Sequence, residues 1–276
     1  MQIGIFAKTF EGVEPGQVLR QAAAAGYTAV QYNMACSGIG SLPTEVSDAV
    51  ATAVASAAAR NGLAVAAVSA TYNMLHPDMA SREQGRAAFA AIAAKARSVG
   101  TNLVTLCTGS RDAADQWRRH PDNETDAAWG EMLREFEILL PLAERYDLFL
   151  GVEPELANVV SSAAKARKLI DTLRSDRIKI VLDPANLFET EAERPSRDII
   201  AEAVERLADS IIMAHAKDRL PDGRFTAAGK GVIDFGRYFA GLRAAGFSGT
   251  VVTHGLAAEE APGVARYLRR QIEAAR

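Results

Sequence analysis

The chain has 276 residues, of which 49% are hydrophobic and 24% are charged, and its formal net charge is −3. This composition predicts a folded globular protein, and the slightly acidic balance argues against nucleic acid and anionic membranes as partners. No apolar run approaches the roughly 20 residues of a membrane helix, and the first residues do not resemble a secretory signal. The two cysteines, Cys36 and Cys107, predict no disulfide framework, so we expect a reducing, cytoplasmic setting.

Eight short runs along the chain are nearly unbroken in apolar character, as expected of parallel strands that are buried on both faces. We predict strands at Gln2–Phe6, Ala29–Tyr32, Ala64–Ser69, Leu103–Leu106, Phe149–Glu153, Ile178–Leu182, Ile211–His215 and Thr250–Thr253.

The stretches between these runs are predicted as helices. Apolar residues recur at three- and four-residue spacing between Met132 and Ala143, and again between Val264 and Ile272, so each stretch has one apolar face. Glycine suits the left-handed conformation that ends a helix. Four glycines just before predicted strands fit this role, namely Gly26, Gly62, Gly100 and Gly246.

Strict alternation of eight strand–helix units predicts an α/β fold, a (β/α)₈ TIM barrel formed by a single domain over residues 1–276. A doubly wound open sheet is the alternative, but eight regular units without an internal linker favour the barrel. Barrel enzymes build their sites on the loops that follow the strands. We therefore expect the functional residues at that end.

The predicted fifth to eighth strands each end in a residue that can bind a metal ion: Glu153, Asp183, His215 and His254. Successive strands of a barrel lie side by side, so these four donors can converge on one ion. A single carboxylate after a strand is more often a helix cap or an ion-pair partner, but four donors at equivalent points predict a metal site. The mixed oxygen and nitrogen donors suit Mn²⁺, Zn²⁺, Co²⁺ or Mg²⁺.

Ordered segments over essentially the whole chain resemble the sugar phosphate isomerase/epimerase superfamily, the xylose-isomerase-like barrels. The segments are Val152-Glu153-Pro154-Glu155, Val181-Leu182-Asp183-Pro184-Ala185-Asn186, His215-Ala216-Lys217-Asp218, Gly229-Lys230-Gly231-Val232-Ile233-Asp234 and Gly246-Phe247-Ser248-Gly249. In that family a Glu, an Asp, a His and a second Glu bind one divalent metal ion. The resemblance places the first three ligands at Glu153, Asp183 and His215.

Two positions depart from the family pattern. The second metal-binding Glu falls on His254, and a His with which many members contact the substrate falls on Asn186. Because His254 is neutral where the family has a carboxylate, less of the ion's positive charge would be neutralised by its ligands. The ion would therefore be a stronger Lewis acid. The family's epimerases use their two glutamates as an acid/base pair, so a two-base epimerisation here needs His254 or another group as the second base.

The resemblance implies a metal-dependent isomerase or epimerase of a small sugar, keto sugar or related polyol carbonyl compound, acting through a metal-stabilised ene-diolate. Glu153 and Glu155 are the candidate bases, and His254 is predicted to be a ligand, an acid/base or both. The residues predicted to bind the substrate are Asn73, His76, Trp117, Asn186, Lys217 and Arg219. Lys217 and Asp218 have a plain alternative as an ordinary surface ion pair.

Three alternatives stay open. A dehydratase or lyase acting on a cyclitol or sugar acid needs one base, which suits a site with a single family glutamate. A metal-dependent nuclease shares the barrel, but the chain has only four histidines and an acidic balance. A degenerate sugar-binding barrel is the third. The exact substrate, the metal and the oligomeric state, including a homo-oligomer, are left open by the sequence.

Overall fold

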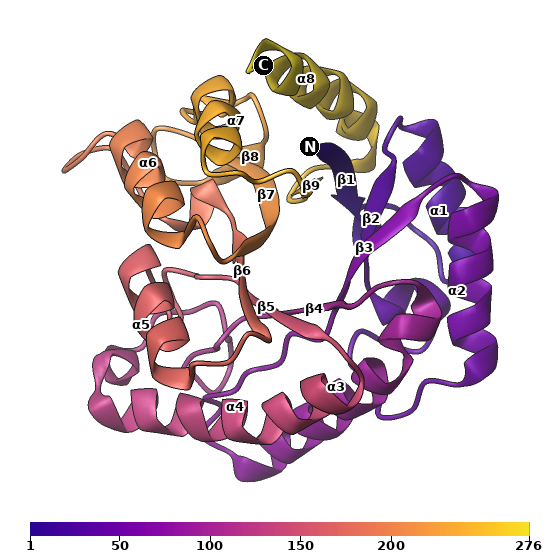
Figure 1. Ribbon diagram of the computed structural model, residues 1–276, viewed down its shortest axis with the longest axis vertical. Coiled ribbons are helices and arrows are strands. Elements are labelled where there is room, and N and C mark those ends of the chain that lie inside the picture. The colour runs from indigo at the N-terminus through magenta and orange to yellow at the C-terminus, as the bar shows by residue number, and fades with distance from the viewer. Residues whose placement is uncertain (276) are drawn as a thin grey trace.

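The computed structural model describes residues 1–275 and shows a closed barrel of eight parallel strands with eight helices around it (Figure 1). The barrel strands are β1 (Gln2–Phe6), β2 (Ala29–Tyr32), β3 (Ala64–Ser69), β4 (Leu103–Leu106), β5 (Phe149–Val152), β6 (Ile178–Leu182), β7 (Ile211–Arg219) and β9 (Thr250–Thr253). They are ordered β6-β5-β4-β3-β2-β1-β9-β7, and the pairing of β6 with β7 closes the ring. The predicted barrel is confirmed, and the open sheet is excluded.

The helices follow the strands in turn. They are α1 (Pro15–Ala24), α2 (Asp48–Arg60), α3 (Met79–Val99), α4 (Asp126–Arg145), α5 (Ala163–Leu173), α6 (Ser196–Leu207), α7 (Phe235–Ala244) and α8 (Ala261–Ala274). Polar side chains cap several N-termini; for example, the carboxylate of Asp78 accepts hydrogen bonds from Ala80 N and Ser81 N at the start of α3. The four glycines predicted to stop helices have positive φ values between 63° and 108°, which confirms their role.

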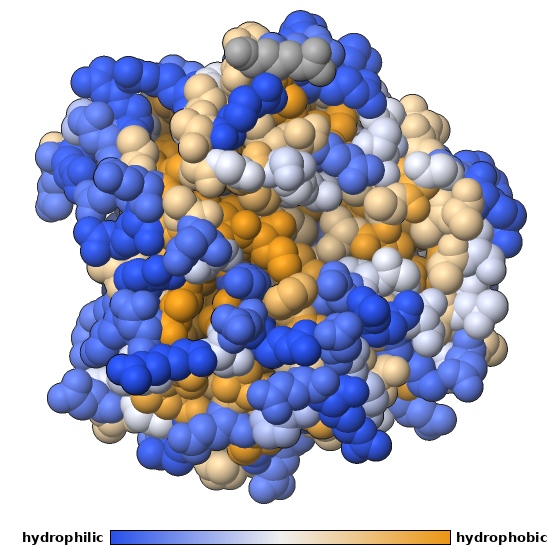
Figure 2. Space-filling model, in the orientation of Figure 1, coloured by the Kyte–Doolittle hydropathy of each residue, from blue (hydrophilic) through white to orange (hydrophobic). Residues whose placement is uncertain are grey.

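Two apolar layers hold the barrel together. The larger one packs the strands against the helices, and it includes the predicted apolar faces of α4 (Met132, Phe136) and α8 (Val264, Leu268). The smaller one consists only of strand residues and fills the barrel: Ala67, Leu103, Val181, Met213 and Val252. Figure 2 shows hydrophobic residues gathered at the centre of one face and hydrophilic residues around the rim. Among the described residues, no helix combines the length and apolar character needed to cross a membrane.

Strand β7 differs from its prediction and changes the shape of the site. It runs four residues beyond the expected end, to Arg219, because it pairs antiparallel with a short strand that was not predicted, β8 (Phe225–Ala227). The turn between them contains Pro221-Asp222-Gly223, and Gly223 has a φ of 88°. Such a sequence is a turn signal that indicates the hairpin in retrospect. Strand β5 ends one residue early, at Val152, so Glu153 begins the following loop.

Candidate metal centre

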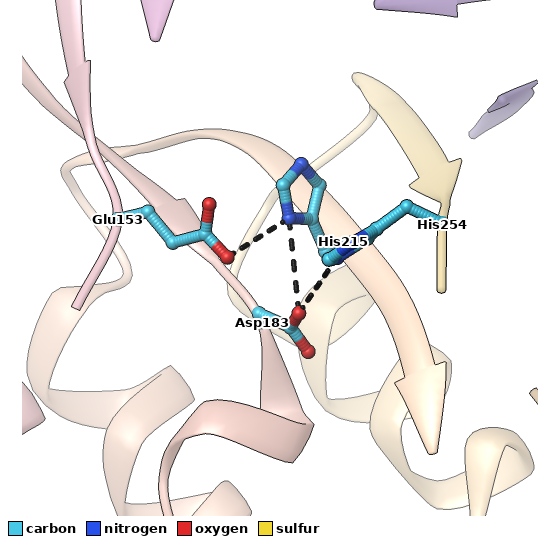
Figure 3. A group of neighbouring side chains, drawn as sticks. All are labelled: Glu153, Asp183, His215 and His254. Atoms are coloured by element: carbon cyan, nitrogen blue, oxygen red, sulfur yellow. Dashed lines mark hydrogen bonds and ion pairs between the residues drawn. The ribbon is translucent and has the colours of Figure 1, made fainter. Parts of the chain in front are cut away.

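Four side chains from neighbouring strand ends converge at the carboxyl end of the barrel (Figure 3). Glu153 follows β5, Asp183 follows β6, His215 lies within β7 and His254 follows β9. One donor atom from each lies within 4.8 Å of the donor atoms of the other three. The first three are buried and His254 is partly buried. The side chains predicted as metal ligands are therefore together in space.

Short polar contacts connect the four side chains. The Nδ1 atom of His215 lies 3.1 Å from Glu153 Oε1 and 3.8 Å from Asp183 Oδ2. On the other side, His254 Nε2 lies 2.9 Å from the same Asp183 oxygen. Asp183 thus occupies the centre of the group, with an imidazole on either side.

The charges around the centre favour donor states that suit a cation. Burial raises the pKa of both carboxyls, but nearby positive groups outweigh it, chiefly His215 at Glu153 and Lys217 at Asp183, so both pKa values lie below their usual range. Burial, followed by Lys217, lowers the pKa of His254. At neutral pH the centre therefore offers two carboxylates and at least one neutral imidazole, and this donor set fits one divalent ion.

His215 has a separate consequence for metal binding. Burial is the largest single influence and lowers the pKa of His215, but the charge and hydrogen bond of Glu153 and the charge of Asp183 together raise it by more, so the net shift is upward. A protonated imidazole cannot bind a metal, so protons compete with a metal ion for this ring more strongly than for an ordinary histidine.

Lys217 is the buried cation of the site, with 5% of its surface exposed. Its Nζ donates to Asn186 Oδ1 at 2.8 Å and lies 3.3 Å from Asp183 Oδ2. Asn186 in turn donates its Nδ2 to Glu153 Oε1 at 2.8 Å. The interpretation of Lys217 and Asp218 as a surface ion pair is wrong, because both are buried and Asp218 accepts from backbone N–H groups at Gly229, Gly231 and Ile233.

Glu155 also faces the centre, 3.9 Å from Lys217 Nζ. Burial is the main cause that raises the pKa of its carboxyl to about 8, partly offset by Lys217. The Glu155 carboxyl is therefore largely protonated at neutral pH and can donate a hydrogen bond or a proton.

This raised pKa predicts a pH-dependent contribution to stability. Between its ordinary value of 4.5 and about 8, the unfolded chain releases the Glu155 proton while the folded protein keeps it. Stability from this group is therefore fully present below pH 4.5 and is lost as the pH rises toward 8. We expect the unfolding free energy of the chelator-treated wild type, minus that of Glu155→Gln, to be larger at pH 5 than at pH 8 in urea titrations. An equal difference at both pH values would contradict the shift.

Gln31 is a site residue that the sequence analysis missed. It lies in β2, is buried, and its Oε1 is 2.9 Å from His215 Nε2. Its Nε2 donates to Thr105 Oγ1 at 3.1 Å, which fixes the amide so that Oε1 accepts from the His215 ring. This contact leaves His215 Nδ1 directed at the carboxylates, as a metal ligand requires. The feature of the sequence that could have indicated this role is the presence of a glutamine in the otherwise apolar run of β2.

Replacing Gln31 with leucine is expected to weaken binding of Mn²⁺ by about 10- to 100-fold, the usual effect of losing a hydrogen bond to a metal-binding histidine. Calorimetric titration of the metal-free protein measures this. Gln31→Glu keeps an acceptor for the ring and should retain most of the affinity. Equal losses in the leucine and glutamate variants would show that Gln31 does not act by orienting His215.

A cavity of about 530 Å³ is lined by three of the four side chains, Glu153, His215 and His254, and we call it the central cavity. Glu155 and Lys217 also line it. Half-exposed aromatic rings stand at its edge, Trp117 from the loop after β4 and Phe225 from β8. Of the residues predicted to bind the substrate, Trp117 and Lys217 line this cavity.

The other predicted substrate-binding residues are placed differently. Asn186 reaches the site through its hydrogen bonds to Glu153 and Lys217. Arg219 is buried and donates to the carbonyl oxygens of Ala185 and Gly223. Asn73 and His76 line a neighbouring cavity, and their polar atoms contact loop backbone: Asn73 Oδ1 accepts from Leu75 N and Ser110 N, and His76 Nε2 lies 3.0 Å from Ala113 O.

The sequence model of the family described as "Xylose isomerase-like TIM barrel" matches residues 19–273. The chain belongs to this family. The resemblance inferred from the strand-end motifs is therefore confirmed.

Solved structures with the same fold include an L-ribulose 3-epimerase, with 18% identity, a TM-score of 0.77, and coverage of 99% of this chain and 95% of that chain. A 3-keto-D-glucoside 4-epimerase from E. coli has 18% identity, a TM-score of 0.75, and coverage of 98% and 99%. A xylose isomerase-like barrel protein from Mycobacterium smegmatis in complex with magnesium has 15% identity, a TM-score of 0.69, and coverage of 95% and 89%. A search of curated proteins gave no match. At these identities the similarity establishes the fold.

Proposed function

We propose that this protein is a divalent-metal-dependent isomerase or epimerase of a small sugar or keto sugar. The observation that carries the proposal is the convergence of four side chains that could hold a metal ion, three of which line the central cavity. A cavity of this size accommodates a monosaccharide. Two of the structurally similar proteins are sugar epimerases, and a third was solved with magnesium.

Glu153, Asp183, His215 and His254 would hold the ion. When bound, the ion would polarise a carbonyl group of the substrate and make the neighbouring C–H bond more acidic. Lys217 and Asn186 hold the two carboxylates in place through the contacts described above.

Proton transfer is assigned to side chains that line the central cavity. Glu153 is ionised and held by Asn186, so it is the base that takes a proton from the substrate carbon. Glu155, protonated below about pH 8, would donate to a substrate oxygen. Figure 3 shows Glu153 and His254 approaching the group from opposite sides. His254 would be the second acid/base group that an epimerisation requires, acting through its Nδ1 if Nε2, which faces Asp183, holds the ion.

The proposal is tested with metal-loaded protein and a panel of ketoses, including L-ribulose, D-psicose, D-tagatose and D-fructose, in D₂O. We expect an isomeric sugar in which one carbon-bound hydrogen is replaced by deuterium, because the proton lost from carbon exchanges with solvent before it returns. Protein with one bound ion that neither converts nor deuterates any member of the panel would contradict the proposal.

A dehydratase or lyase is the second candidate, and His254 is the observation that favours it. Of the four candidate ligands, two are carboxylates, Glu153 and Asp183, and only Glu153 lines the central cavity. The site therefore offers the substrate a single carboxylate base. One base and one activated hydroxyl suffice to eliminate water. Mass spectrometry of the products formed in H₂O separates the two functions, since elimination lowers the mass by one water and isomerisation leaves it unchanged.

A further inference from the structure

A second cavity, of about 480 Å³, adjoins the central cavity, and we call it the side cavity. Leu42, Gln116 and Trp117 line both cavities and therefore form the boundary between them. The rest of the side cavity is formed by the start of α3 with its preceding loop and by the loop that follows β4. The central cavity alone is large enough for a monosaccharide, so the proposed reaction leaves the side cavity without a role.

Gln116 carries an unused acceptor at this boundary. Among the described residues, no hydrogen-bond donor contacts its Oε1, although this atom is buried. A buried polar atom without a partner is costly and uncommon in native proteins. Because this atom is covered, the Gln116 side chain must rotate toward the boundary before a hydroxyl group of a ligand that passes from one cavity to the other can satisfy it.

The chemistry of the side cavity favours a neutral ring over an anion. Its lining contains no lysine or arginine and includes one carboxylate, Asp115, so neither phosphate nor carboxylate would find a counter-charge there. The ring of Trp117 and the side chains of Tyr72 and Ala114 offer apolar surface. Apolar surface beside a free hydrogen-bond acceptor suits a sugar ring, which has C–H faces and hydroxyl edges.

We propose that the physiological substrate is a keto sugar that carries a second, neutral sugar ring. The reacting unit occupies the central cavity and the second ring occupies the side cavity, where Gln116 accepts a hydrogen bond from it and Trp117 packs against it. This inference rests on the proposed function for the identity of the reacting unit.

The test compares D-fructose with three keto-disaccharides, turanose, lactulose and isomaltulose, in which a hexose is joined to O3, O4 or O6 of fructose. Binding to the metal-loaded protein is measured by calorimetry, and turnover is measured separately. Ala114→Trp fills the side cavity from an exposed loop position. Ala87→Trp is the matched control, because Ala87 is exposed on α3 and lines neither cavity.

We expect at least one disaccharide to bind about tenfold or more tightly than D-fructose in the wild type and in Ala87→Trp. Ala114→Trp should reduce this preference to about twofold or less and leave the affinity for D-fructose unchanged. Gln116→Leu should cost the disaccharide about three- to tenfold in affinity, as expected for one neutral hydrogen bond. The side cavity should not make D-fructose 6-phosphate bind more tightly than D-fructose, because its lining has no lysine or arginine for the phosphate.

Equal affinity for D-fructose and all three disaccharides, or a preference that Ala114→Trp leaves intact, would overturn the inference. The proposed function fails in a different way. If the disaccharide preference is present and depends on Ala114 but no ketose is converted, the side cavity binds a second ring as inferred and the isomerase assignment is wrong.

Discussion

Replacing Glu153 with glutamine is expected to lower kcat on the preferred ketose by about 10²- to 10⁴-fold, the usual contribution of a general acid–base group. Glutamine has nearly the same shape and keeps an oxygen for the ion, but it cannot accept a proton. The hydrogen bond between Asn186 and Glu153 Oε1 can survive the change. Turnover should therefore fall far more than binding of the substrate.

This experiment is carried out at saturating Mn²⁺, with metal content verified in each variant, so that loss of the ion does not account for the loss of rate. Glu137→Gln, at an exposed position on α4, is the matched control and should keep wild-type activity. A metal-replete Glu153→Gln protein with wild-type kcat would remove Glu153 from the chemistry.

Replacing Asp183 with asparagine is expected to have the second largest effect, on metal binding and on folding together. Asp183 lies between His254 and Lys217 and is 1% exposed. Its loss removes a charged ligand and leaves the buried Lys217 ammonium without its nearest carboxylate. We expect Mn²⁺ affinity to fall by more than about 100-fold, beyond the effect of losing a contact that only orients a ligand. The unfolding free energy of the metal-free protein should fall by about 3 kcal/mol.

Asp209→Asn provides the control for stability. Asp209 pairs with Arg167 at 3.2 Å, but its side chain is 71% exposed, so removing the charge should cost less than about 1 kcal/mol. Chemical denaturation with and without Mn²⁺ measures both variants. Equal stability losses in the two variants would show that the Asp183 carboxylate does not stabilise the buried lysine.

The barrel could be predicted from the sequence because its strands are apolar on both faces. Six of the eight barrel strands have the predicted bounds, and the four candidate metal ligands stand at equivalent points of successive units. A short apolar run indicates a buried strand, and the Asp183 or His254 at its end indicates a candidate ligand, from neighbouring residues alone. No distant contact is needed to recognise it.

The end of β7 could not be predicted in this way, because its last residues are polar and are stabilised by pairing with β8. Once the strand is known to continue, the alternation of side chains places Lys217 on the same face as His215, two residues earlier. The burial of Lys217, and with it the charge balance at Asp183, depends on that extension.

Contacts between strands that are distant in the chain could not be predicted from the sequence either. Gln31 reaches His215 across 184 positions, and Thr105 reaches Gln31 across 74. Asn73 and His76 were selected for their polar character in a loop, but the structure uses their polar atoms to hold loop backbone. Residue type and spacing do not distinguish a residue that contacts the substrate from one that holds loop backbone, because each role needs a polar group near a strand end.

The four-ligand centre is tested most directly by the number of divalent ions that the chain binds and by their affinity. Metal-free wild type, His254→Ala and Asp183→Asn would be titrated with Mn²⁺, Zn²⁺, Co²⁺ and Mg²⁺ by calorimetry, with elemental analysis of the loaded proteins. We predict one ion per wild-type chain, bound at least about tenfold more weakly by His254→Ala and more weakly still by Asp183→Asn. Failure of the wild type to bind any of the four ions, or binding that neither substitution weakens, would contradict the four-ligand centre.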